Sequence, residues 1–193
     1  VKYIKDIENE SALNIGQTYV VLCISLNEEG QTHYVIKRSL KHYCFGFFLA
    51  DCFEIVSSKI PDCWIFTKNK NEIDILPAKW NFDEFWLQYS DYDPEVYNMA
   101  EKEVKKMILT ELPMDEFNRA LKPRSYGEWN YIDELEYILE MITEARDHRF
   151  IKHILEVAKW FESYTFNQIN EYTYKQELEV FENVYRYLSI FKE

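Results

Sequence analysis

The first third of the chain alternates apolar and polar positions at the spacing of β-strands. Residues 18–26 and 31–38 form the clearest pair, joined by a turn that ends at Gly30, because glycine readily adopts the positive φ angles of tight turns. Both faces of 18–26 are apolar, which predicts a strand in the middle of a sheet. Further strands are expected at 47–56, 63–68 and 72–76. Five short strands with short turns predict a small antiparallel sheet, barrel-like or strongly bent.

Helical spacing replaces this alternation after Pro77. Residues 80–90 are rich in aromatic side chains and predict a short helix whose rings plug one end of the sheet; the alternative interpretation is a platform for a ligand. Asp93-Pro94-Glu95 predicts the start of a longer helix, because Asp caps free N–H groups and proline fits the first helical position. We expect that helix to end near Leu112, before Pro113.

The remaining sequence predicts further amphipathic helices with short connections. They are expected at 114–121, 131–146, 148–161 and 167–191, where apolar residues recur every three or four positions. Short connections favour an antiparallel helical bundle. The sequence therefore predicts an α+β chain, with a small antiparallel β domain at 1–79 and an acidic helical domain at 80–193.

The negative charge belongs mainly to the predicted helical half. Residues 1–80 hold 9 Lys and Arg against 10 Asp and Glu, and residues 81–193 hold 13 against 24, which together give the net charge of −12. Such a field repels nucleic acid and anionic membranes and attracts basic proteins. We therefore expect a basic protein partner, although solubility alone also accounts for an acidic surface. The 15 tyrosines suit a binding interface, or they reflect the composition of the genome.

The cysteines do not predict a metal site. Cys23, Cys44, Cys52 and Cys63 have no C-x-x-C spacing, and three of them lie in apolar, strand-like runs. We therefore expect buried free thiols of a cytoplasmic protein, and a disulfide is the alternative. No apolar run is long enough to span a membrane, and no signal peptide is visible.

Catalytic patterns are also missing from the sequence. It has no phosphate-binding loop, nucleophile elbow or zinc-protease motif. His148 and His153 are five residues apart, which points them about 140° apart around a helix and does not suit one metal. Cys44 could act as a nucleophile with His42 as its base, but no other feature of the sequence supports this pair. We therefore predict no enzyme activity and no cofactor.

One stretch combines carboxylates with aromatic rings and is the candidate site for a partner. Its predicted partner-binding residues are Trp86, Tyr89, Asp91, Tyr92, Asp93 and Glu95. Acidic and aromatic groups together can imitate nucleic acid and occupy the basic cleft of a nuclease, with charge speeding the encounter and rings prolonging the contact. The outer face of 133–144 is the second candidate. A merely solvated helix face is the alternative for both.

The segment FFLADCFEIV…PDCWIF…W…FW…Y.D.DPE, within the acidic, aromatic-rich chain, resembles immunity proteins of bacterial polymorphic-toxin and contact-dependent inhibition systems. The resemblance implies a tightly bound cognate toxin as partner, and no cofactor. It assigns no functional residue.

The expected function is therefore a binding protein that neutralises a protein toxin. Two alternatives stay open: a structural or regulatory interaction module of a mobile element, and an enzyme with an unrecognised carboxylate site.

Overall fold

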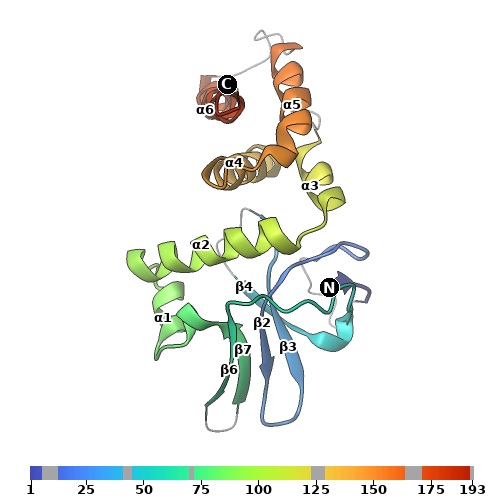
Figure 1. The fold of residues 1–193 in the computed structure, drawn as a ribbon, viewed down its shortest axis with the longest axis vertical. Coiled ribbons are helices and arrows are strands. Elements are labelled where there is room, and N and C mark those ends of the chain that lie inside the picture. The colour runs from blue at the N-terminus through green and yellow to red at the C-terminus, as the bar shows by residue number, and fades with distance from the viewer. Residues whose placement is uncertain (6–12, 41–44, 70–71, 123–128, 164–170, 192–193) are drawn as a thin grey trace. The chain divides into compact units, whose positions relative to one another are not determined.

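The computed structural model describes residues 1–5, 13–40, 45–69, 72–122, 129–163 and 171–191. It confirms an α+β chain with antiparallel sheets (Figure 1). The chain divides into two compact units: unit 1 holds residues 1–38 and 42–113, and unit 2 holds residues 39–41 and 114–193. The helices that follow residue 79 as far as Pro113 therefore group with the sheet. The predicted domain boundary after residue 79 stays a prediction.

Unit 1 is built on a five-stranded antiparallel sheet. Its strands are β2 (Val21–Leu26), β3 (Thr32–Lys37), β4 (Phe45–Leu49), β6 (Trp64–Asn69) and β7 (Glu72–Pro77), in the order β4-β3-β2-β7-β6. The central place of β2 confirms the prediction from its two apolar faces. The sheet is not closed into a barrel, so the barrel-like arrangement is not confirmed.

A small two-stranded sheet covers part of one face of the large sheet. β1 (Lys2–Tyr3) pairs with β5 (Phe53–Glu54), which follows the 3-10 turn η1 (Ala50–Cys52). Tyr3 and Phe53 pack with Tyr34 and Ile36 of β3 in one buried cluster. The sequence pattern missed β1, because two residues are too few to show an alternation.

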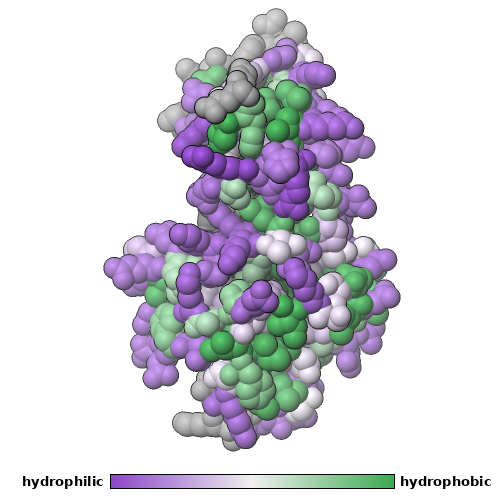
Figure 2. Space-filling model, viewed as in Figure 1, coloured by the Kyte–Doolittle hydropathy of each residue, from purple (hydrophilic) through white to green (hydrophobic). Residues whose placement is uncertain are grey.

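Two helices cover the other face. After the 3-10 turn η2 (Ala78–Trp80) come α1 (Phe85–Ser90) and α2 (Pro94–Glu111). Val35 and Cys23 are buried on this face, and burial raises the pKa of the Cys23 thiol to about 12. Elsewhere on unit 1, hydrophobic surface is visible over β2, β6 and β7 (Figure 2).

Unit 2 contains only helices among its described residues. They are α3 (Met114–Leu121), α4 (Trp129–Glu144), the 3-10 turn η3 (His148–Phe150), α5 (Ile151–Ser163) and α6 (Glu171–Ser189). α6 packs on both α4 and α5. α4 and α6 are viewed almost along their axes in Figure 1, whereas α5 lies across them, so a simple antiparallel bundle is not confirmed.

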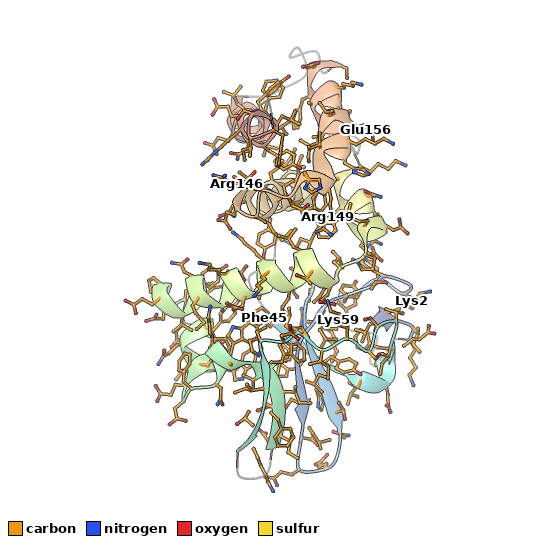
Figure 3. The ribbon with its side chains drawn as sticks, in the orientation of Figure 1. Lys2, Phe45, Lys59, Arg146, Arg149 and Glu156 are labelled. Carbon is orange, nitrogen blue, oxygen red and sulfur yellow. The ribbon has the colours of Figure 1, made fainter. Side chains whose placement is uncertain are left out.

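The corner between α4 and η3 is closed by a residue in the left-handed conformation. Arg146 has φ 50°, its N–H bonds Thr143 O at 3.1 Å, and the N–H of Asp147 bonds Ile142 O at 2.9 Å. This is the Schellman pattern, which usually places glycine at the left-handed position. The Asp147 side chain then caps η3. Hydrogen bonds from the Arg149 side chain lower the pKa of the Asp147 carboxyl. Arg146 and Arg149 are labelled in Figure 3.

Replacing Arg146 with glycine should stabilise unit 2. The Arg146 side chain is exposed, and glycine removes the Cβ strain of a positive φ. We expect Arg146→Gly to raise the free energy of unfolding by about 0.5–1 kcal/mol, less than the full strain because glycine also loosens the unfolded chain. Urea denaturation would measure this, with Arg186→Gly inside α6 as a control that should destabilise. A lower midpoint for Arg146→Gly would contradict a strained left-handed residue at this corner.

Candidate partner-binding surface

The corner between α1 and α2 carries most of the predicted partner-binding residues. α1 ends in the same Schellman pattern as α4, with Tyr92 at φ 57°, its N–H bonded to Tyr89 O at 3.2 Å and the N–H of Asp93 bonded to Gln88 O at 3.0 Å. Asp93 then begins α2, as predicted: its carboxylate accepts from Glu95 N at 3.0 Å and Val96 N at 3.1 Å. We call residues 91–95 the acidic corner.

The acidic corner is open to solvent. Asp91, Tyr92, Asp93 and Glu95 are all exposed, and Tyr92 keeps 56% of its surface, although its ring lies 5.9 Å from that of Tyr97. The structure thus places four of the six predicted residues side by side on one short, defined turn. Because Asp93 also holds the first turn of α2, its carboxylate has a structural role beside any contact with a partner.

Tyr89 lies inside the unit rather than on its surface. It is 5% exposed, its ring stacks on Phe45 with centroids 4.4 Å apart, and its hydroxyl donates to Glu101 Oε1 at 3.1 Å. The other carboxylate oxygen of Glu101 accepts from Lys37 Nζ at 2.8 Å. Tyr89 therefore ties the acidic corner to β4 and, through Glu101, to β3 (Phe45 is labelled in Figure 3).

Trp86 is half-buried and connects the corner to the edge strand β4. Its ring makes edge contacts with Phe47, at 5.5 Å between centroids, and with Phe45, at 5.9 Å. Phe47 itself is 56% exposed. Trp86 and Phe47 thus present aromatic surface beside the acidic corner. Trp80, Trp86 and Tyr89 each contact the ring of Phe45 in β4, so three of the aromatic residues that were expected to plug the sheet pack against this edge strand.

Sequence reasoning missed several residues of this surface. Phe82, Leu87 and Phe47 are 41%, 57% and 56% exposed. Phe82 was expected on the buried side of a helix, but the helix begins only at Phe85, because Glu84 takes the left-handed conformation with φ 68°. Phe47 lies in the predicted strand 47–56, and the sequence pattern of a strand does not show which face of the sheet other elements cover.

The charge on this part of the chain has one sign. Between Asn81 and Ala100 there are five carboxylates and no Lys, Arg or His. Those acids are Asp83, Glu84, Asp91, Asp93 and Glu95, all exposed. An exposed group of like charges beside exposed apolar side chains favours contact with a basic surface.

The second candidate surface, the outer face of 133–144, is less open. Asp133, Glu134 and Glu136 of α4 are half-buried, whereas Glu140 and Glu144 are exposed. All five residues take part in interactions with other groups of the chain. We therefore base the proposed site on the acidic corner.

The described part of the chain contains no cluster of His, Cys, Asp and Glu able to hold a metal ion. Cys23, Cys52 and Cys63 are free thiols. Cys23 and Cys52 are buried, as predicted, whereas Cys63 is only half-buried. Cys44 and His42 lie outside the described residues. Within the described ranges, no helix combines the length and apolar character needed to cross a bilayer.

No protein-family model, curated protein or solved structure matches this chain. The function is therefore inferred from the chain's own residues.

Proposed function

We propose that this chain is a non-enzymatic binding protein that neutralises a basic protein partner, as an immunity protein does for its cognate toxin. The observation that supports the proposal is the one-signed, exposed stretch from Asn81 to Ala100, where five carboxylates lie among exposed Phe82, Leu87 and Tyr92. Carboxylates accelerate the encounter with a cationic surface, and apolar side chains slow dissociation once water is excluded.

The geometry of the acidic corner suits such a contact. Two helix ends meet there, and the Schellman hydrogen bonds together with the Asp93 cap fix the backbone. A fixed turn loses little conformational entropy when a partner binds, which favours affinity. The half-buried Trp86 and the buried Tyr89 hold the turn against the sheet from behind.

A nuclease is the kind of toxin that fits these groups best. Its active cleft is basic because it must bind phosphates, so carboxylates spaced among aromatic rings can occupy the same groups as nucleic acid. The proposal places the chain in the cytoplasm, where a nuclease toxin would act on the cell's own nucleic acid.

Affinity capture from the native host tests the proposal. The purified chain is used as bait at low and at moderate salt, and any recovered protein is assayed for nuclease activity with and without the chain. We expect one basic protein, recovered in equal amount to the bait and inhibited by it. Recovery of no protein at either salt, or of a partner whose activity is unchanged, would contradict the proposed function.

A further inference from the structure

The strand β6 forms an open edge of the five-stranded sheet. It is the last strand in the order, and its six residues pair with β7 in unbroken register, from Trp64 opposite Pro77 to Asn69 opposite Glu72. No other described strand pairs with its outer side. Natural edge strands are usually protected against pairing by bulges, prolines or charges. β6 has no bulge and no proline, and Lys68 is the one charged side chain within it.

Apolar side chains continue across the sheet to this edge. Phe66 is aligned with Ile75 of β7, and Ile75 with Ile24 of β2, so the three side chains share one face. In the next row on that face, Lys68 is aligned with Ile73, and Ile73 with Leu26. Phe66 keeps 65% of its surface exposed, and the four aliphatic residues are half-buried.

Among the described residues, the buried cluster on this face does not reach the edge. The buried cluster around Tyr3 and Phe53 packs over β3 and extends to Ile24 of β2, with no residue of β6 or β7 in it. Figure 2 shows hydrophobic surface over β2, β6 and β7, the strands that carry this strip. An apolar strip that ends at an unpaired strand edge suits the addition of another strand.

The charges near β6 favour a second copy of the chain as the added strand. The six aligned residues of the strip include one cation, Lys68, and no carboxylate, on a chain of net charge −12. Asp62 lies just before β6, and both it and Lys68 are exposed. If two β6 strands pair antiparallel about a two-fold axis near Ile65, Lys68 of each copy comes to the end of the other strand that carries Asp62, in the turn just before Trp64. Such a pairing is self-complementary in charge.

We propose that two copies of this chain associate through their β6 strands, which joins the two five-stranded sheets and buries Phe66 at the junction. This surface differs from the acidic corner, so the proposal does not depend on the proposed function. Self-association through β6 would leave the acidic corner of each copy free to bind its partner.

Sedimentation equilibrium of the full chain tests the proposal. We expect the wild-type chain to have twice the mass of the 23.5 kDa monomer, and Phe66→Lys to have the mass of one chain. Phe47→Lys is the matched control, because Phe47 is a similarly exposed phenylalanine on the other edge strand, and this variant should stay dimeric. Far-UV circular dichroism verifies that each variant is folded.

A charge exchange makes the test specific to the proposed pairing. Lys68→Asp and Asp62→Lys should each raise the dissociation constant about tenfold or more, because the two-fold axis places like charges together twice. An equal mixture of the two variants should dimerise like the wild type, because each chain then meets the opposite charge. The proposal would be overturned by a monomeric wild-type chain, by a dimer that survives Phe66→Lys, or by a mixture that remains dissociated. If Phe66→Lys fails to fold, Lys68→Asp and Asp62→Lys, which change exposed residues, test dimerisation through β6 instead.

Discussion

Lys37→Met should strongly destabilise unit 1. Lys37 and Glu101 are 6% and 7% exposed, and their ion pair at 2.8 Å joins β3 to α2. Removal of the ammonium group leaves the Glu101 carboxylate buried opposite a thioether. Breaking a buried ion pair in this way costs about 3–5 kcal/mol. Urea denaturation followed by hydrogen exchange of unit 1 amides would measure the loss.

A second substitution should restore much of that stability. In Lys37→Met with Glu101→Gln the buried charge is gone, while the amide oxygen still accepts from the Tyr89 hydroxyl. Since neutral replacements of buried ion pairs are often close to neutral in stability, we expect the double variant within about 1–2 kcal/mol of the wild type. Lys59→Met is the matched control: its pair with Glu111 involves a 62% exposed lysine side chain, so the loss should stay under about 1 kcal/mol. If Lys37→Met and Lys59→Met lowered the free energy of unfolding equally, burial would not determine how much an ion pair contributes to stability.

Phe150→Ala should have a comparable effect on unit 2. Phe150 of η3 is fully buried, and its ring meets Phe117 of α3 edge-on with centroids 4.9 Å apart. A cavity of this size costs about 3–5 kcal/mol. Because unit 2 is compact by itself, the added hydrogen exchange should be confined to its helices. Native-state hydrogen exchange with residue resolution measures both units at once.

The control for this change is Leu155→Ala on the same helical segment. Leu155 keeps 44% of its surface exposed, and alanine is a strong helix former, so unfolding should change by less than about 1 kcal/mol. If Phe150→Ala accelerated exchange equally in the sheet of unit 1, the two units would not be separate in stability.

The hydrophobic pattern predicted helices and strands correctly where one periodicity continued over several helical turns or along a whole strand. The hairpin β2–β3, the strands β6 and β7, the Asp93-capped start of α2 and the helices α3 to α6 all lie near their predicted positions. The predicted strand 47–56 is in fact β4, the 3-10 turn η1 and the two residues of β5. The bend between them places Phe53 beside Tyr3, and such a long-range contact leaves no local signal.

In the candidate site, too, the sequence predicted local features but not long-range contacts. Charge and helix capping identified the acidic corner, because both are local properties of residues 91–95. Burial of Tyr89 depends on its contacts with Phe45 and Glu101, which the linear pattern does not reveal. The exposure of Phe47 and Phe66 depends equally on which part of each sheet face another element covers, so only the three-dimensional arrangement could reveal it.

Tyr89 connects the proposed binding surface to the residues that stabilise unit 1. Its ring and hydroxyl link the acidic corner to the buried Lys37–Glu101 pair. A variant that loosens this pair should therefore also loosen the turn at residues 91–95. Loss of binding by such a variant would not by itself identify a contact residue, so substitutions on the exposed side of the corner give the clearer test.

The association rate of the captured partner tests the central proposal most directly. Asp91→Lys with Glu95→Lys reverses two exposed charges of the corner and keeps the Asp93 cap intact. Glu29→Lys with Glu72→Lys makes the same change in net charge at exposed sites in the β2–β3 turn and at the start of β7. At low salt we expect the corner variant to associate about tenfold more slowly than the wild type, and the control variant to change far less. Equal rates for the corner variant and the wild type, or equal slowing in both variants, would contradict binding at the acidic corner.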